Sequence, residues 1–289
     1  MFYNFLEDDN QFLKAFDAIS ESNFYKGTTP ELGYQHKIGH IQKVMLFSKI
    51  IAQNESLDEQ QTKILLASAA FHDSGRIKDR DNGEHGKVSA EIAGEYFKNN
   101  YNNPYGITQN EIAIVQTVIA YHVIIEKTPG QIDEKELEKL CHKYGIYNLK
   151  NFKNVKKISA ILKDADALDR LRFSSKESSR LNLDTKFLRT ETAKKQYIIE
   201  LARLINQAYA GYILRENYPN KSVIDNDNAK TLQVLRHNFR INNGGIRKRE
   251  KEIPTQIVKL LFRYGLQSIK IVKSDYVNSK EKDIDEREV

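Results

Sequence analysis

The sequence has very little cysteine and no long apolar run. Its 289 residues include a single cysteine, Cys141, which excludes an internal disulfide and any cysteine-rich metal site. No uninterrupted apolar run approaches the ~20 residues that a membrane-spanning helix needs. The first residues lack the basic, apolar and small-residue parts of a cleaved signal peptide. We therefore expect a cytoplasmic protein, although export without a cleaved signal would leave no such trace.

Proline is also scarce, and signals for β-structure are missing. The chain has only five prolines, many Ile, Leu, Lys and Glu positions, and apolar residues that recur at helical spacing. It shows no strand-like alternation, no internal repeat and no Gly-rich phosphate loop. We predict an all-α fold with one domain over residues 1–273, made of a core at about 34–173 and a C-terminal helical extension at 190–273. Residues 274–289 are expected to form a charged, mobile tail.

The charge balance is mildly basic. Lys and Arg number 45 against 39 Asp and Glu, which gives a net charge of +6. Such a balance favours phosphate-bearing partners. The two signs are interspersed along the chain rather than massed, so a nucleic acid is an unlikely partner and a membrane surface is not expected.

Two stretches have the form of a capping box, in which residues three apart satisfy backbone groups at a helix start. They are Ser56-Leu-Asp-Glu59 and Thr108…Glu111. The first predicts a helix through Lys63–Phe71, and the second predicts an apolar helix that carries His122 near its end.

A histidine–aspartate pair, His72-Asp73, stands where the apolar run of the first of these helices gives way to a Gly-Arg turn. The chain has seven histidines, and others lie in helical segments on either side. His36 and His40 share one face of a predicted helix with three large apolar residues, so both should be at least half buried. Because divalent first-row metals bind imidazole and carboxylate well, this set is a candidate metal centre.

The order His…His-Asp…Asp resembles that of the HD-domain metal-dependent phosphohydrolase superfamily. The resemblance covers roughly Tyr34–Phe173 and implies an HD-type helical bundle with a divalent ion at its catalytic core. Four motifs carry it: Gln35-His-Lys-Ile-Gly-His-Ile, Phe71-His-Asp-Ser-Gly-Arg, Glu84-His-Gly and Asp164-Ala-Asp-Ala-Leu-Asp.

By this resemblance His40, His72, Asp73 and one later aspartate hold the ion, and the later one is either Asp164 or Asp166. Helix geometry separates the two, because Asp164 shares a face with apolar residues whereas Asp166 lies near charged ones. The apolar face is expected to point inward, so we predict Asp164. The identity of the metal (Mn, Mg, Fe, Co, Ni or Zn) and the number of ions, one or two, stay open.

The remaining histidines of the motifs have roles implied by the same resemblance. His85 and His122 match extra histidines that bind a second metal, bridged by the His-Asp carboxylate, or contact substrate phosphate. His36, four residues before His40, matches a histidine that protonates the leaving oxygen in cyclic-nucleotide phosphodiesterases. A group that titrates near neutral pH suits that role, so His36 is the candidate general acid, with metal-activated hydroxide as the nucleophile.

Phosphate oxygens also need cationic partners. Arg76 and Arg172 lie close in sequence to the candidate ligands, which makes them candidate substrate-binding residues. The segment that begins at Leu183 is similar to a stretch in some bacterial HD proteins, including phosphodiesterases that act on phosphoribosyl-linked protein. This similarity adds Arg189 as a possible substrate contact.

The resemblance predicts a phosphodiesterase that cleaves a nucleotide-derived or phosphoribosyl-linked phosphodiester. The same ligands would support a nucleotidase acting on nucleoside phosphates. A non-catalytic nucleotide-binding HD module and an iron-dependent oxygenase, which exists in this superfamily on a related ligand set, are further alternatives.

Overall fold

The structure is a computed structural model, and the chain divides into two compact units. One unit is Asp9–Lys195, and the other combines Met1–Asp8 with Gln196–Val289. All regular elements in the described part of the chain are helical, so the predicted all-α class is confirmed there, whereas the predicted domain boundaries stay a prediction. The described residues are 10–21, 38–77, 83–173, 183–196, 198–199, 201–203 and 205–206.

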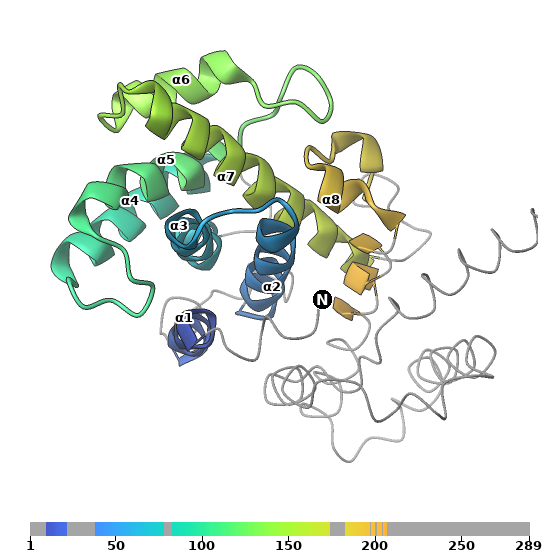
Figure 1. Cartoon of the computed structure of the whole chain (residues 1–289), viewed down its shortest axis with the longest axis horizontal. Helices are drawn as coiled ribbons and strands as arrows, with labels where there is room; N and C mark the ends of the chain where they lie inside the picture. The colour runs from blue at the N-terminus through green and yellow to red at the C-terminus, as the bar shows by residue number, and fades with distance from the viewer. Residues whose placement is uncertain are drawn as a thin grey trace, which may run out of the picture. The chain divides into compact units, whose positions relative to one another are not determined.

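The first unit is a bundle of helices around α2 and α3 (Figure 1). α7 runs across both of them, α4 lies beside α5, and α6 packs on α5 and α7. Its elements are α1 (Asn10–Glu21), α2 (Ile38–Asn54), α3 (Glu59–Phe71), α4 (Glu84–Asn99), η2 (Gln109–Glu111), α5 (Ile112–Tyr121), α6 (Glu134–Lys143), α7 (Leu149–Asp169), η3 (Arg170–Phe173), η4 (Thr185–Phe187) and α8 (Glu191–Lys194).

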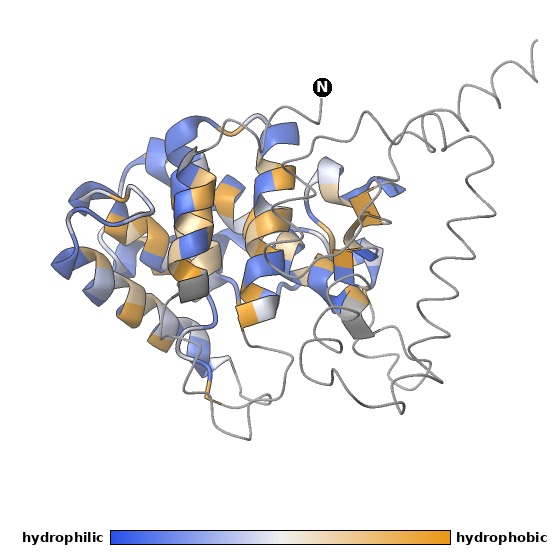
Figure 2. Ribbon diagram, turned by 90° about the horizontal axis from the view of Figure 1, so that it is seen from below, coloured by the Kyte–Doolittle hydropathy of each residue, from blue (hydrophilic) through white to orange (hydrophobic). Residues whose placement is uncertain are grey.

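The core is centred on α2 and α3. Every residue of α2 from Gly39 to Ala52 is buried, as is every residue of α3 from Ile64 to Phe71. Alanines at 67, 69 and 70 keep α3 thin, so α2, α5 and α7 can all contact it. Hydrophobic residues gather on the inward sides of the helices and hydrophilic ones on the outer sides (Figure 2). No helix in the described ranges is long and apolar enough to cross a membrane.

One predicted capping box is confirmed, and the other lies elsewhere. Glu111 accepts hydrogen bonds from the backbone N and the Oγ1 of Thr108, as the sequence predicted. The box at the start of α3 instead joins Asp58 and Gln61, whose side chains bond each other's backbone N–H at 2.7 and 3.1 Å. The prediction that Ser56 opens this box was wrong because the helix begins later, and Ser56 adopts a positive φ of 53°.

Several predicted features lie outside the described residues. They include His36, the charged tail, and the C-terminal extension from residue 207 onward. Within the described part of that extension, Thr190 caps α8 through a hydrogen bond from Ala193 N to its Oγ1, and α8 ends at Lys194.

α4 and α5 approach each other closely at two glycines of α4. A Cβ at Gly86 would lie 2.6 Å from Cγ2 of Val123 and 3.3 Å from the carbonyl oxygen of Ala120. A Cβ at Gly94 would meet the terminal amide of Gln116, which sits at the end of a flexible side chain. Gly86 follows His85 directly, so the contact at Gly86, which involves the backbone of Ala120, also sets the position of that histidine.

We expect Gly86→Ala to lower the free energy of unfolding by about 1–3 kcal/mol, the usual cost of overpacking a fitted contact. Urea denaturation measures this quantity. Gly94→Ala in the same helix is the matched control, because Gln116 can turn away with the loss of its hydrogen bond to the carbonyl oxygen of Ala90, and alanine offsets that loss with up to ~1 kcal/mol of helix propensity over glycine. Equal free energies of unfolding for the two variants would contradict the packing argument.

Candidate functional site

Four histidines converge on the carboxylate of Asp73. Their rings form a row, with centroids 5.2 Å apart for His40 and His72, 5.1 Å for His72 and His122, and 5.0 Å for His85 and His122. The structure therefore brings together four of the histidines that the sequence singled out. All four side chains and Asp73 are buried.

The ends of helices bring these residues together. His72 is the C-cap of α3 and His122 is the C-cap of α5, while His85 is the second residue of α4 and His40 lies in the first turn of α2. Asp73 follows His72 in a tight turn. Because the ends of four separate helices meet here, residues far apart in sequence reach one point.

A first cluster consists of His40, His72, Asp73 and Asp166. Nε2 of His40 lies 3.2 Å from Nε2 of His72 and 3.6 Å from Oδ2 of Asp73. Nε2 of His72 lies 3.9 Å from the same Asp73 oxygen. Oδ1 of Asp166 lies 3.4 Å from Nε2 of His40, and the Asp166 side chain is 31% exposed, which opens this edge of the cluster to solvent.

Hydrogen bonds on the far side of each imidazole fix its orientation. Nδ1 of His40 donates to Oδ2 of Asp169 at 2.6 Å, and Nδ1 of His72 donates to the carbonyl oxygen of Ala69 at 2.8 Å. Nζ of Lys43 lies 2.8 Å from the other oxygen of Asp169 and holds that carboxylate in place. In the neutral imidazoles the Nε2 atoms then present lone pairs toward the cluster, which is how metal-bound histidines are usually arranged.

The first cluster has the donor chemistry of a divalent metal site. The Nε2 atoms of His40 and His72 and a carboxylate oxygen of Asp73 lie within 4.8 Å of one another, and all three residues are buried. Ligands at the ~2.1 Å typical of metal–nitrogen and metal–oxygen bonds stand about 3–3.5 Å apart around a common ion. The closer separations in this cluster match that range, so a modest adjustment would let these residues hold an ion.

A second cluster shares Asp73 and adds His85 and His122. Oδ1 of Asp73 lies 3.2 Å from Nε2 of His85 and 3.6 Å from Nε2 of His122. The two Nε2 atoms are 3.2 Å apart. Burial outweighs the bond to Asp73 and lowers the pKa of His122 to about 4, so this imidazole is neutral at neutral pH. Each oxygen of Asp73 thus faces one pair of histidines.

Asp164 does not lie with the first cluster, contrary to the prediction. Its carboxylate accepts hydrogen bonds from the backbone N and the Oγ1 of Thr190 at 2.7 and 2.8 Å. It also accepts from the backbone N and Nη1 of Arg189 at 2.9 and 3.1 Å. Asp164 is fully buried, as its place on the apolar face implied, but it anchors the segment that follows residue 183.

The predicted aspartate lies away from the first cluster because α7 is surrounded by more than one neighbour. Residues two apart on a helix point in nearly opposite directions, so Asp164 and Asp166 serve different neighbours. Asp166 faces His40 on α2, and its side chain stays partly exposed. The fully buried carboxylate, that of Asp164, is therefore the one that anchors the segment after residue 183, and the carboxylate beside the first cluster is the partly exposed one of Asp166.

The remaining predicted substrate contacts stand in different places. Arg76 bonds Asp73 and His85 and so joins the second cluster. The guanidinium of Arg189 instead bonds Glu126, Asp164 and the carbonyl oxygen of Phe187. The side chain of Arg172 is not among the described ones.

Lys163 connects the Arg189 network to the second cluster. Its Nζ donates to the carbonyl oxygens of His122 at 3.0 Å and Ile124 at 2.6 Å, and lies 3.5 Å from Oε1 of Glu126. Burial lowers the pKa of Lys163 to about 8, against the attraction of Glu126. The lysine thus holds the chain directly after α5 and with it the backbone of His122.

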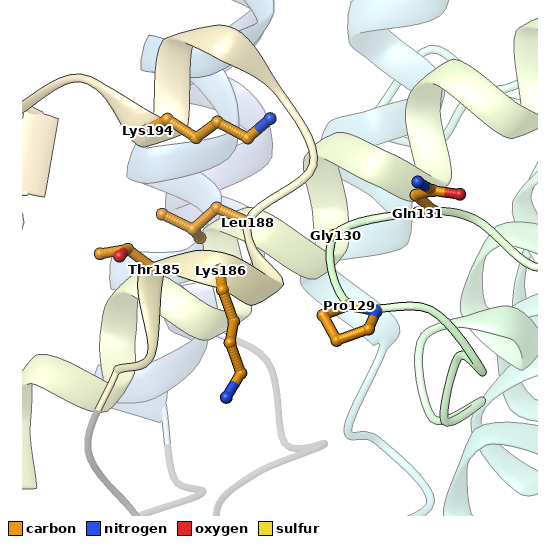
Figure 3. Close-up of a pocket in the computed structure, with 7 residues that line it drawn as sticks. All are labelled: Pro129, Gly130, Gln131, Thr185, Lys186, Leu188 and Lys194. Carbon is orange, nitrogen blue, oxygen red and sulfur yellow. The ribbon is translucent and has the colours of Figure 1, made fainter.

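A cavity of about 450 Å³ opens between the loop at 129–131 and the segment at 185–194 (Figure 3). Gly130 lies against this segment with a positive φ of 71°, and a Cβ there would lie 2.7 Å from the carbonyl oxygen of Lys186. None of the clustered residues lines this cavity, so it is separate from the two clusters. Its lining residues are Pro129, Gly130, Gln131, Thr185, Lys186, Leu188 and Lys194.

No role was predicted for Asp169, Lys43, Lys163 or Glu126 from the sequence. A signal for the first two was present, because His40 and Lys43 on α2 and Asp166 and Asp169 on α7 both repeat at a spacing of three. Two basic residues three apart on one helix can pair with two acidic residues three apart on another, so this spacing indicates that α2 and α7 face each other. Glu126 and Lys163 carried no such signal, since their partners are backbone carbonyls and a residue from a distant segment.

Comparison with known protein families gives a match. The model of the SidE phosphodiesterase (PDE) domain matches residues 34–215, which is more than half of the chain. No curated protein and no solved structure matches significantly. The matched range contains both clusters and the segment that Asp164 anchors.

We expect Asp166→Asn to weaken Mn²⁺ binding by more than the roughly 10–100-fold that loss of an outer hydrogen-bond partner costs. The reason is that Asp166, unlike Asp164, lies against His40. Isothermal titration with Mn²⁺ measures the affinity, and Asp164→Asn is the isosteric control that should stay close to wild type. A greater loss of affinity in Asp164→Asn would return Asp164 to the ligand set.

Proposed function

The chain belongs to the SidE phosphodiesterase domain family, and on that premise we propose that it is an HD-type, metal-dependent phosphodiesterase. The observation that supports this most is the first cluster, where two imidazole nitrogens and two carboxylates lie together at a partly open edge. A buried set of this kind is costly to the fold unless a cation or a substrate uses it.

His40, His72, Asp73 and Asp166 are the proposed ligands of a divalent ion. When bound, such an ion polarises a phosphoryl oxygen and lowers the pKa of water, which supplies a nucleophile at neutral pH. Asp169 and the carbonyl of Ala69 orient the two imidazoles, so the ligands are arranged before an ion or a substrate arrives. Asp73 would balance positive charge on both of its sides.

Arg76 and His36 have the remaining proposed roles. Arg76, 14% exposed at its side chain and bonded to Asp73, stands at the cluster edge where it could also meet a phosphate oxygen. His36 remains the proposed general acid for the leaving oxygen, on the sequence argument alone. His36 stands four residues before His40 in the sequence, the spacing at which residues of a helix share one face.

The proposed substrate is a phosphodiester in which a phosphoribosyl group is linked to protein, or one derived from a nucleotide. Membership in a phosphodiesterase family and the similarity of the segment after Leu183 to phosphodiesterases of phosphoribosyl-linked protein support the first of these. The net charge of +6 is compatible with either, since both carry phosphate.

A screen of the purified protein tests the function. With Mn²⁺ added, we expect cleavage of a phosphoribosyl–protein conjugate or a cyclic dinucleotide to a phosphorylated product, detected by mass spectrometry. His72→Ala should abolish cleavage, because it removes a ligand from the first cluster. His142→Ala is the matched control, since His142 is exposed and stacks on Tyr147 away from both clusters.

Other results would replace the proposal by one of its alternatives. Release of inorganic phosphate or triphosphate from mononucleotides, without cleavage of any diester, would indicate a nucleotidase. Nucleotide binding without turnover would indicate a non-catalytic module. Undiminished cleavage by His72→Ala would remove the first cluster from the reaction.

His36→Ala tests the general acid. We expect the turnover number to fall by about 10²–10⁴-fold, the usual contribution of an acid–base group, because the leaving oxygen would depart unprotonated. Mn²⁺ content should stay at the wild-type value, which distinguishes this role from that of a ligand. Wild-type turnover in His36→Ala would rule the role out.

A further inference from the structure

The second cluster contains a cation of its own, the guanidinium of Arg76. Its Nε lies 3.0 Å from Oδ1 of Asp73, and its Nη2 lies 2.8 Å from Nε2 of His85. A guanidinium only donates hydrogen bonds, so both atoms accept from Arg76. They are two of the three atoms that would ligate an ion in this cluster, the third being Nε2 of His122.

The two clusters therefore differ in what faces their nitrogen atoms. In the first cluster, Nε2 of His40 faces another imidazole nitrogen and the carboxylates of Asp73 and Asp166. In the second, Nε2 of His85 faces the N–H groups of Arg76 as well as Asp73. The lone pair of His85 and one oxygen of Asp73 are already matched to the positive charge of a guanidinium.

The turn that follows α3 positions Arg76 beside the second cluster. Arg76 is three residues after Asp73, and its backbone N–H donates to the carbonyl oxygen of Asp73 at 3.0 Å. Gly75 bonds Oγ of Ser89 through its backbone N–H, and a Cβ at Gly75 would lie 2.7 Å from atoms of Val88. The close approach to α4 brings the Arg76 guanidinium beside His85, one turn before Ser89.

A divalent ion and this guanidinium are mutually exclusive at the second cluster. The ion would need the same lone pair of His85 and the same oxygen of Asp73 that Arg76 occupies. Two positive charges a few ångströms apart in a buried site also repel each other strongly. The positive charge of Arg76 compensates the carboxylate of Asp73 on this side, so this cluster does not need an ion for charge balance.

We propose that Arg76 is the resident cation of the second cluster and takes the place of a second divalent ion. The protein then binds one ion per chain, at the first cluster, and Arg76 is a positioning residue for Asp73 and His85. This inference rests on the proposed function, in which the first cluster holds an ion.

The test counts ions. Purified full-length chain is loaded with excess Mn²⁺, passed through a desalting column, and analysed by inductively coupled plasma mass spectrometry. We expect one Mn²⁺ per chain for wild type and two for Arg76→Met, which frees the ligands of the second cluster. Electron paramagnetic resonance should show an isolated Mn²⁺ in wild type and a spin-coupled pair, bridged by Asp73, in the variant.

Two further variants control for the loss of charge and for folding. Lys87→Met removes a positive charge from the same helix as His85 at an exposed position, and it should stay at one ion. Circular dichroism checks folding, and Arg76→Gln, which also lacks the charge but remains polar, carries the test if Arg76→Met does not fold.

Three results would overturn the inference. Two ions in wild type would show that Arg76 does not exclude the second ion, and the proposed function would stand. One ion in both Arg76 variants would show that another feature limits the count. No ion in wild type would refute the metal site of the proposed function together with the inference, so this failure differs from the other two.

Discussion

The carboxylate of Asp73 is the group on which the rest of the site depends. A buried carboxylate is costly unless charged or hydrogen-bonding groups surround it. Here one oxygen faces His40 and His72 and the other faces His85, His122 and Arg76. The ends of α2, α3, α4 and α5 must therefore meet at this point, and the small residues of α3 and Gly86 of α4 make that approach possible.

α7 contributes side chains to this arrangement from two of its own faces. Toward α2 it presents Asp166 and Asp169, one beside the Nε2 and one beside the Nδ1 of His40. In the other direction it presents Lys163 and Asp164, which hold the chain after His122 and the segment after residue 183. A single helix thus connects the first cluster, the second cluster and the downstream segment.

Much of the fold could be predicted because helical spacing is local, whereas the grouping of His40, His72 and Asp73 followed from the resemblance of the short motifs to those of HD-domain proteins. The choice between Asp164 and Asp166 could not be predicted, since it depends on which neighbours surround α7 rather than on how apolar each face is. The start of α3 at Asp58 instead of Ser56 is a similar case, because both residues are good caps and only the packed helix selects one. Glu126 had no local signal, as its partner Arg189 lies 63 residues away.

The bonds between Asp164 and the 189–190 segment decide how short the chain can be made. A chain ending at Phe173, where the motifs of the sequence end, would deprive a fully buried carboxylate of four donor atoms on Arg189 and Thr190. It would also leave Glu126 without its arginine, directly after the stretch that Lys163 holds. A fragment that keeps Asp164 and Glu126 paired therefore has to include Arg189 and Thr190, and Lys195, just after α8, is where the first compact unit ends.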